Sequence, residues 1–307
     1  MTAKKSKKPS LKFSNRGPQS RLSYLFGFLF KLILIIFMIA VIYKSPLLTD
    51  FKKTIKHKPP AAKIVKPDTQ QKPETFLPAP VKKQTISTKP KLIFIIDDMG
   101  TTKKYKEELE SLRGDVTYAI LPQCPYSEHF AKLSLKTKAE TIVHLPLESE
   151  KNNNPGPGLI TTRMSYSQIV DMLEANLKSV PYHKGMNNHM GSKGTADKRL
   201  MRIILEKTRE RGLFFLDSRT TTSSVIIKIA RDMKVPAIKR DVFLDNAADP
   251  KLIRKQIEVL TQIAKKNGHA VGIGHYKLNT LKVLNEEIPR LKSQGFKIIS
   301  LSEFFRK

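Results

Sequence analysis

Cysteine is nearly absent from this sequence, because Cys124 is the only one among 307 residues. A single thiol excludes an intramolecular disulfide and any zinc site built from several cysteines. Acidic residues are scarce too: 27 Asp and Glu face 56 Lys and Arg, so the formal net charge is +29. An excess of this size favours anionic surroundings such as nucleic acid, acidic lipid head groups or an anionic wall polymer.

The sequence also lacks the interleaving of aromatic and basic residues that is typical of single-strand nucleic-acid binders. Most lysines of residues 91–307 lie on predicted amphipathic helices, where they are expected to form solvated faces. We therefore predict no specific nucleic-acid partner. A membrane-tethered protein that attracts nucleic acid by charge alone is the least favoured function.

The positive charge is concentrated at the amino terminus. Residues 1–90 contain 19 Lys and Arg against 3 acidic residues, so they carry +16 and leave +13 of the total for residues 91–307. Residues 1–21 are basic and polar, whereas residues 22–47 are almost wholly apolar. About 20 apolar residues suffice to cross a bilayer as one helix. We predict a basic cytoplasmic tail over 1–21 and a transmembrane signal anchor over 22–47.

Two features bear on how this apolar stretch is used. Lys31 is costly inside a bilayer, but near the cytoplasmic edge its methylenes let the ammonium group reach the head groups. A cleaved signal peptide is the alternative, yet residues 43–46 read Y-K-S-P, without the small residues of a cleavage site. The sequence favours an uncleaved anchor with its amino terminus inside. This predicts a single-pass protein of the bacterial inner (cytoplasmic) membrane, with its carboxyl-terminal domain in the periplasm or outside the cell.

The stretch that follows is rich in proline and lysine. Eight prolines lie between residues 44 and 90, and large apolar residues are few. Such a composition cannot bury enough apolar surface to fold, and proline keeps the chain extended. We predict a disordered linker over 48–90 that holds a folded domain of residues 91–307 away from the membrane.

From residue 91 onward, short apolar runs alternate with helical patterns. The apolar runs predict strands over Leu92–Asp97, Val116–Leu121, Glu140–Leu145, Lys184–Asn188, Leu213–Asp217, Ala237–Leu244, Ala270–Ile273 and Lys297–Ser300. Charged periodic stretches predict helices, most clearly over Lys198–Arg211, Ser223–Lys234, Pro250–Asn267 and Leu278–Gln294. Strands that alternate with helices imply a parallel sheet with helices outside. We predict an α/β fold, an irregular (β/α) barrel of about seven strands, with an open doubly wound sheet as the alternative.

Most of the predicted strands end on a polar side chain suited to chemistry. The first strand runs into Asp97 and Asp98, and the later ends carry His144, His189, Asp217, Asp245 and His275. In barrels of this kind the active site lies at the carboxyl ends of the strands. These residues therefore predict a single active-site rim.

Six short motifs, taken in order, resemble those of the divergent polysaccharide deacetylases, relatives of the NodB-like carbohydrate deacetylases. They read I-I-D-D-M-G (95–100), V-H-L-P-L-E (143–148), N-N-H-M-G-S (187–192), F-L-D-S-R-T (215–220), V-F-L-D-N (242–246) and G-I-G-H (272–275). The resemblance covers about residues 90–305. It implies a barrel of about seven strands and a metal-dependent hydrolase that removes acyl groups, chiefly acetyl, from a polysaccharide.

The resemblance also implies the metal ligands. In the NodB-like pattern the first motif ends in a general base and a metal ligand, which here would be Asp97 and Asp98. The second motif of that pattern supplies two His four residues apart, whereas this chain has His144 and Glu148, and His189 is an equal candidate for the third ligand. We expect a divalent metal, zinc before magnesium or manganese, on Asp98, His144 and His189, because imidazole suits zinc. Glu148 is expected behind these ligands.

The remaining motifs imply the groups that surround the reaction. His275 matches the general acid of the family's last motif, and a pKa near neutrality suits that role. Asp217 is expected to hold the second nitrogen of that imidazole, as a carboxylate does in a triad. Asn188, Asp245 and Arg240 are expected to line the substrate groove or to brace the rim. The arginine–proline motif that usually bounds the NodB-like groove is absent.

Two functions from different classes fit these residues. The first is a membrane-anchored, metal-dependent hydrolase that removes acyl groups from a cell-envelope polysaccharide by cleaving an amide or an ester. The second is a catalytically silent barrel that binds glycan or a partner protein of the envelope, and the altered second and third motifs favour it.

Overall fold

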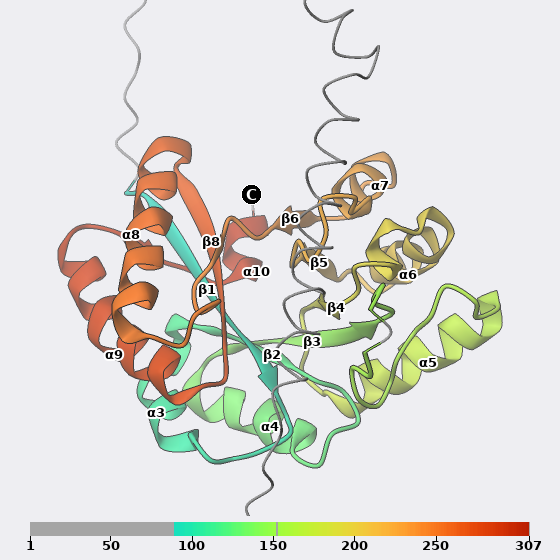
Figure 1. Cartoon of the computed structure of the whole chain (residues 1–307), viewed down its shortest axis with the longest axis horizontal. Helices are drawn as coiled ribbons and strands as arrows, with labels where there is room; N and C mark the ends of the chain where they lie inside the picture. The colour runs from blue at the N-terminus through green and yellow to red at the C-terminus, as the bar shows by residue number, and fades with distance from the viewer. Residues whose placement is uncertain (1–88, 152, 307) are drawn as a thin grey trace, which may run out of the picture. The chain divides into compact units, whose positions relative to one another are not determined.

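The computed structural model describes residues 89–151 and 153–306, which form an α/β unit with the strands inside and the helices outside (Figure 1). Its single sheet has nine strands, and every strand pair is parallel. The strands are β1 (Lys91–Met99), β2 (Thr117–Ile120), β3 (Glu140–Leu147), β4 (Gly185–Met190), β5 (Phe214–Asp217), β6 (Ala237–Lys239), β7 (Val242–Phe243), β8 (His269–His275) and β9 (Lys297–Ile298).

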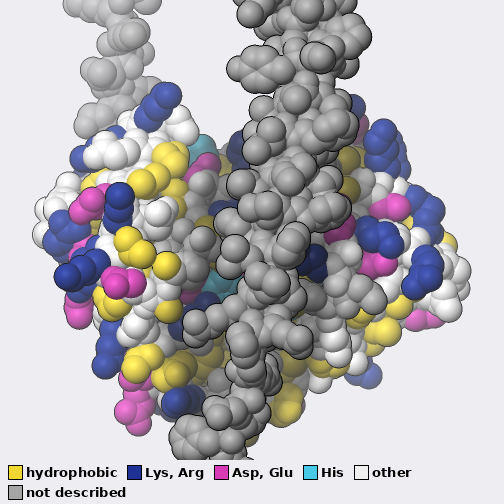
Figure 2. All heavy atoms as spheres, viewed as in Figure 1, with side chains coloured by type: hydrophobic (Ala, Val, Ile, Leu, Met, Phe, Trp, Pro, Cys, Tyr) yellow, Lys and Arg dark blue, Asp and Glu magenta, His cyan; other side chains and the backbone are white. Residues whose placement is uncertain are grey.

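The helices connect the strands and cover the outside of the sheet (Figure 1). They are α3 (Lys106–Ser111), α4 (Ser127–Thr137), α5 (Tyr166–Ser179), α6 (Lys198–Glu210), α7 (Ile226–Asp232), α8 (Pro250–Asn267), α9 (Leu278–Ser293) and α10 (Leu301–Phe305). Two short 3-10 helices, η2 (Arg113–Asp115) and η3 (Gly194–Ala196), lie in loops. On the face shown in Figure 2, Lys and Arg side chains are spread over the helices of both flanks, as expected of solvated helix faces.

No helix within residues 89–151 and 153–306 is long and apolar enough to cross a membrane. The predicted cytoplasmic tail (1–21), the predicted transmembrane anchor (22–47) and all but the last two residues of the predicted linker (48–90) lie outside the described residues.

The sheet is buried on both faces, which explains the nearly continuous apolar runs of the sequence. Leu92, Phe94 and Ile96 of β1 pack into a core that includes residues of the outer helices. Ile93 and Ile95 point the other way, into a second core built almost entirely from strand residues. Successive side chains of a strand face opposite sides, so the two cores are the outside and the inside of a curved sheet. The inner core is the interior of the barrel.

The curved sheet is a half-barrel whose two edges are formed by one interrupted stretch of chain. The sheet order is β6-β5-β4-β3-β2-β1-β8-β7, with β9 added to β1, so β6 and β7 form the two edges. The predicted single strand over 237–244 is thus two strands, β6 paired with β5 and β7 paired with β8. Between them, Arg240 N donates to Asp217 O and Asp241 N donates to Val271 O, both at 2.9 Å. If β6 and β7 are counted as one strand and β9 is left out, the sheet has seven strands, which is the number expected.

Candidate metal centre

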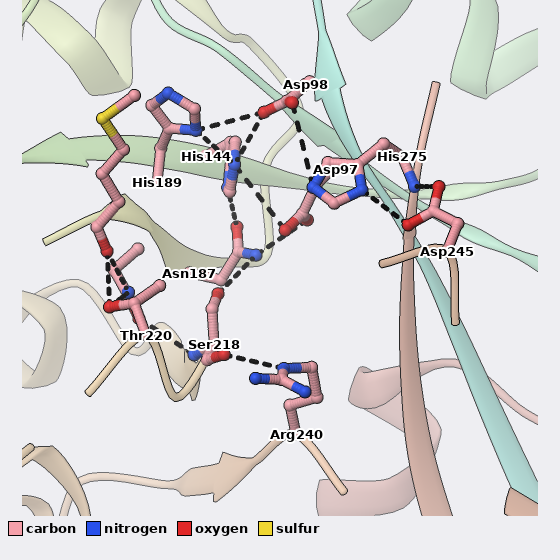
Figure 3. A network of polar contacts seen from close by, with 12 residues as sticks. Asp97, Asp98, His144, Asn187, His189, Ser218, Thr220, Arg240, Asp245 and His275 are labelled. Atoms are coloured by element: carbon pink, nitrogen blue, oxygen red, sulfur yellow. Dashed lines mark hydrogen bonds and ion pairs between the residues drawn. The ribbon is translucent and has the colours of Figure 1, made fainter. Parts of the chain in front are cut away.

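The residues of the site follow the inner-core residues along the same strands. On β1 the buried side chains of Ile93 and Ile95 are followed, two residues on, by Asp97. The same step of two leads from Ile142 to His144 on β3 and from Ile273 to His275 on β8. Because the strands are parallel, these inner-facing positions meet at one end of the barrel (Figure 3).

The register of neighbouring strands sets which of these side chains lie side by side. Asp97 is paired with His275 between β1 and β8, and His144 is paired with Asn187 between β3 and β4. His189 lies two residues beyond Asn187 and therefore on the same side of β4. The expected rim is thus formed by Asp97, His144, His189 and His275.

Asp98 joins this group through a break in the strand. An adjacent residue would face the opposite side, but the pairing of β1 with β2 shifts between Ile96 and Met99. Asp98 itself has a φ of 63°, in the left-handed region that non-glycine residues rarely adopt. This local irregularity turns the Asp98 carboxylate back towards the rim.

Asp98, His144 and His189 bring three ligand atoms together. Asp98 Oδ1 lies 3.3 Å from His144 Nε2 and 3.1 Å from His189 Nδ1, and the two nitrogens are 3.0 Å apart. Zinc–ligand distances near 2.0–2.1 Å in a tetrahedron give ligand–ligand separations of about 3.3 Å. These three residues have the donor atoms and the mutual spacing of three zinc ligands.

The hydrogen positions also favour a cation among these three atoms. Asn187 Oδ1 lies 2.9 Å from His144 Nδ1, and an amide oxygen only accepts, so a neutral His144 carries its proton on Nδ1. His144 Nε2 then presents a lone pair. Asp98 Oδ1 is buried, and its one possible donor with both rings neutral is His189 Nδ1, 3.1 Å away, if His189 carries its proton on that nitrogen. When both rings are neutral, at most one proton therefore lies among the three atoms Asp98 Oδ1, His144 Nε2 and His189 Nδ1.

The carboxylates and imidazoles shift each other's pKa. Burial would raise the pKa of Asp98, but His144 and His189 outweigh it and hold that pKa well below its usual range. Burial would lower the pKa of His144, but the carboxylates of Asp97 and Asp98 raise it instead. The cluster therefore carries a carboxylate that stays ionised, as a metal ligand must.

Asp97 lies beside this cluster and is buried. Its Oδ1 accepts a hydrogen bond from Asn187 Nδ2 at 2.9 Å, and its Oδ2 lies 3.6 Å from His144 Nε2. Burial raises the pKa of Asp97, with the nearby His144 and His275 acting in the opposite direction. A buried carboxylate with a raised pKa is suited to accept a proton from a substrate or a water molecule.

His275 lies on the opposite flank of Asp98 and is held by Asp245. The Nδ1 of His275 donates to Asp245 Oδ1 at 2.7 Å, while Asp245 Oδ2 accepts from the His275 backbone N and from Thr280 Oγ1. The Nε2 atom lies 3.9 Å from Asp98 Oδ2. Burial would lower the pKa of His275, but Asp245 raises it. The imidazole is thus oriented with Nε2 towards the cluster.

Comparison with known proteins identifies the family. A family model of divergent polysaccharide deacetylases matches residues 94–305. The chain belongs to the divergent polysaccharide deacetylase family. The family predicted from the six motifs is therefore confirmed.

Relatives of this deacetylase-family chain occur in Haemophilus influenzae and Escherichia coli. An uncharacterized protein of Haemophilus influenzae is 31% identical over 216 residues, which cover 70% of this chain and 77% of that protein. The uncharacterized protein YibQ of Escherichia coli is 29% identical over 201 residues, covering 66% of this chain and 63% of that protein. A solved structure of an uncharacterized protein from Agrobacterium tumefaciens, ATU2773, is 20% identical, with a TM-score of 0.68 over 70% of this chain and 89% of that chain. The last likeness supports the fold.

The predicted role of Asp217 is wrong. Its carboxylate accepts from Arg219 N and Ser224 Oγ and makes no hydrogen bond to His275. Leu216 faces the inner core, so the next residue on β5 faces away from it. The sheet order also separates β5 from β8, whereas β7 is paired with β8 and leads directly to Asp245. Asp245, expected only to line the groove or brace the rim, holds the general-acid candidate.

The prediction for Glu148 is wrong as well. Its carboxylate accepts from Thr162 N and Oγ1 and from Lys193 Nζ, and has no hydrogen bond or ion pair with the three ligand candidates. β3 ends at Leu147, so Glu148 already belongs to the loop, where its backbone N donates to Ile160 O. Glu148 anchors this loop beside the site, and His189 takes the third ligand position in the geometry.

Asn188 and Arg240 lie beside the ligand candidates. Both line a pocket of about 720 Å³ that also contains Asp97, His144, His189 and His275. Asn188 Oδ1 accepts from Ser218 N, and its Nδ2 donates to Met190 O, so it joins the ends of β4 and β5. Arg240 donates to the carbonyl oxygens of Ser218 and Arg219.

One residue of the site was missed. Asn187 is fully buried and joins His144 to Asp97 through the two ends of its amide, with Ser218 Oγ 3.2 Å from Nδ2 (Figure 3). The alternation of side chains along β4 could have found it, because residues 187 and 189 share a face. The motif match drew attention to Asn188 and His189 instead.

Proposed function

We propose that this chain is a metal-dependent hydrolase that removes acyl groups, acetyl above all, from a saccharide of the bacterial cell envelope. The observation that supports this most strongly is the arrangement at the rim. Three residues with the spacing of metal ligands lie next to two groups suited to move protons, Asp97 and His275. Amide or ester hydrolysis requires these parts: a base for the water, an acid for the leaving group and an electrophile for the carbonyl.

The metal site would be formed by Asp98, His144 and His189, and zinc is the cation that two imidazoles and one carboxylate favour. A cation bound there would polarise the acyl carbonyl and make water more acidic. Asn187 keeps His144 Nε2 free of a proton and so keeps this nitrogen available for binding.

Asp97 and His275 would act in turn during hydrolysis. Asp97 would take the proton of the attacking water on its carboxylate while the water oxygen bonds to the acyl carbon. His275, with Nδ1 bound to Asp245, would donate a proton from Nε2 to the departing nitrogen or oxygen as its bond to the acyl carbon breaks. Asp245 would keep the ring in this orientation and stabilise its protonated form.

The location at the inner membrane is part of the same proposal. The basic tail, the apolar stretch over 22–47 and the proline-rich stretch over 48–90 support an anchored protein whose domain lies in the periplasm or outside the cell. An envelope polysaccharide would be within reach of such a domain.

Metal content and acetate release test this function together. The full-length chain, purified without chelator, should contain about one zinc per molecule and should release acetate from acetylated chitooligosaccharides. Dipicolinate should remove both properties, and added zinc should restore both. A protein that binds these oligosaccharides but holds no stoichiometric metal and releases no acetate would instead be the catalytically silent barrel.

The corrected partner of His275 gives a further prediction. Asp245→Asn should lower the rate of acetate release by about a hundredfold or more, because an amide does not fix the Nδ1–H tautomer. Asp217→Asn is the matched control, because its carboxylate serves only the loop at 217–224, and it should leave the rate nearly unchanged. Initial rates, measured with zinc content and urea unfolding on the same samples, check both. Equal losses in the two variants would contradict the assignment of Asp245.

A further inference from the structure

Two arginines line the pocket on the side away from the metal ligands. Arg219 and Arg240 both contribute to its wall, together with Ser218 and Thr220. Neither guanidinium lies within 4.0 Å of a carboxylate oxygen belonging to residues 89–151 or 153–306. Arginines that are partly buried usually pair with an acidic group, because removing their charge from water is costly.

Arg240 is held in place by two carbonyl oxygens and an aromatic ring, none of which carries a negative charge. Its Nε donates to Ser218 O at 2.8 Å and one terminal nitrogen donates to Arg219 O at 3.1 Å, while the guanidinium lies 4.9 Å from the centre of the Phe243 ring. That ring packs edge-on against His275, with their centroids 5.0 Å apart. The Phe243 ring thus lies between the Arg240 guanidinium and His275, the general-acid candidate. Burial lowers the pKa of its guanidinium, although Asp97 and Asp217 oppose this.

Each carboxylate of the pocket already accepts a hydrogen bond from another donor and has none from either arginine. Asp241, which also lines the wall, accepts from Val271 N at 2.8 Å, and Asp97 accepts from Asn187. The other terminal nitrogen of Arg240, Nη1, has no hydrogen-bond partner among the described residues. It is therefore available to a ligand in the pocket. A planar guanidinium with a free edge matches a carboxylate or a phosphate.

We infer that the substrate is an acidic saccharide, in which a carboxylate or phosphate group lies next to the sugar that carries the acyl group. This inference rests on the proposed function, because it places the acyl group at the metal ligands and the acidic group at Arg240 and Arg219. The pocket binds the anion through its two arginines while His275 and Asp97 face the acyl carbon.

Three ligands that share one acetylated sugar test the inference. We would titrate the full-length chain, as purified and in 0.15 M salt, with N-acetylglucosamine, N-acetylmuramic acid and N-acetylglucosamine 6-phosphate. The second ligand adds one carboxylate to the first, and the third adds a phosphate. At least one acidic ligand should bind about tenfold more tightly than the neutral sugar. The tighter of the two distinguishes a sugar acid from a phosphorylated sugar.

Variants locate the preference. Arg240→Gln and Arg219→Gln should each lose the extra affinity for the acidic ligand and keep that for the neutral sugar. Arg202→Gln, on the exposed surface of α6, controls for attraction by the overall positive charge and should change neither. Equal affinity for all three ligands, no binding of any, or a loss as large with Arg202→Gln overturns the inference.

Acetate release, measured in parallel, separates this inference from the function on which it rests. Release from neutral and acidic ligands at equal efficiency would leave the hydrolase standing and remove the acidic substrate. A preference for the acid that depends on the arginines, without acetate release from any ligand, would retain the anion site and remove the hydrolase.

Discussion

Replacing Asp97 with asparagine should leave zinc in the protein and remove most of its acetate release. The carboxylate is buried beside the ligand cluster, and its Oδ1 accepts from Asn187 Nδ2 at 2.9 Å. An amide keeps the volume of the side chain but cannot take a proton from water. Groups that act as general acid or base contribute about a hundredfold to ten-thousandfold to a rate, and a loss in this range is expected. Initial rates and zinc content of the same sample measure it.

Asp98→Ala is the matched variant, because it changes the neighbouring carboxylate and should act on the metal instead. Loss of one of three ligands should lower zinc affinity by more than about a hundredfold, and acetate release should fall with it. Equal zinc content and equal rates in the wild type and in both variants would refute the roles assigned to Asp97 and Asp98.

Replacing Asn187 with leucine should weaken zinc binding, although Asn187 is not one of the ligands. The change removes the acceptor for His144 Nδ1 and the donor for Asp97 Oδ1, each 2.9 Å away. Without that acceptor, the proton of His144 is free to move to Nε2, the atom that faces Asp98. Loss of a hydrogen-bonded partner behind a metal ligand lowers affinity by about tenfold to a hundredfold. Competition with a chromophoric chelator measures this affinity.

Two more variants separate this effect from loss of stability. Asn187→Asp keeps an acceptor for His144 but places a second carboxylate beside Asp97, so zinc affinity should hold while acetate release falls. Asn176→Leu removes another fully buried asparagine, which bonds Gly158 O and Gln123 Nε2. It should lower the free energy of unfolding without changing zinc affinity. The same loss of zinc affinity in both leucine variants would show that Asn187 acts only through the fold.

Much of the fold and most of the rim could be predicted from the sequence. The apolar runs are continuous because both faces of β1, β3 and β8 are buried, so a run such as 92–96 signals an inner strand without any alignment. Asp97, His144 and His275 follow at the ends of such runs. The carboxyl ends of parallel strands all lie at the same end of the barrel. The rule needs no knowledge of which strand neighbours which.

The errors arose where that knowledge is necessary. Asp217 and Asp245 both end apolar runs, and only the pairing of β7 with β8 shows that Asp245 is the one beside His275. Apolar residues occur on both sides of Arg240 within 237–244, and the sequence does not show that the strand changes partner there. Glu148 was placed by its spacing from His144, but the strand ends one residue before it.

At Asp98 the backbone conformation favours glycine, whereas the candidate metal site requires a carboxylate. A left-handed conformation costs a non-glycine residue about 1 kcal/mol or more, so glycine would fit the turn at position 98 with less strain. Glycine has no carboxylate, however, and would leave the two imidazoles without the third candidate ligand. Selection for thermal stability alone would therefore favour glycine at position 98, at the cost of a carboxylate of the candidate metal site. Any such engineering has to keep residue 98 unchanged.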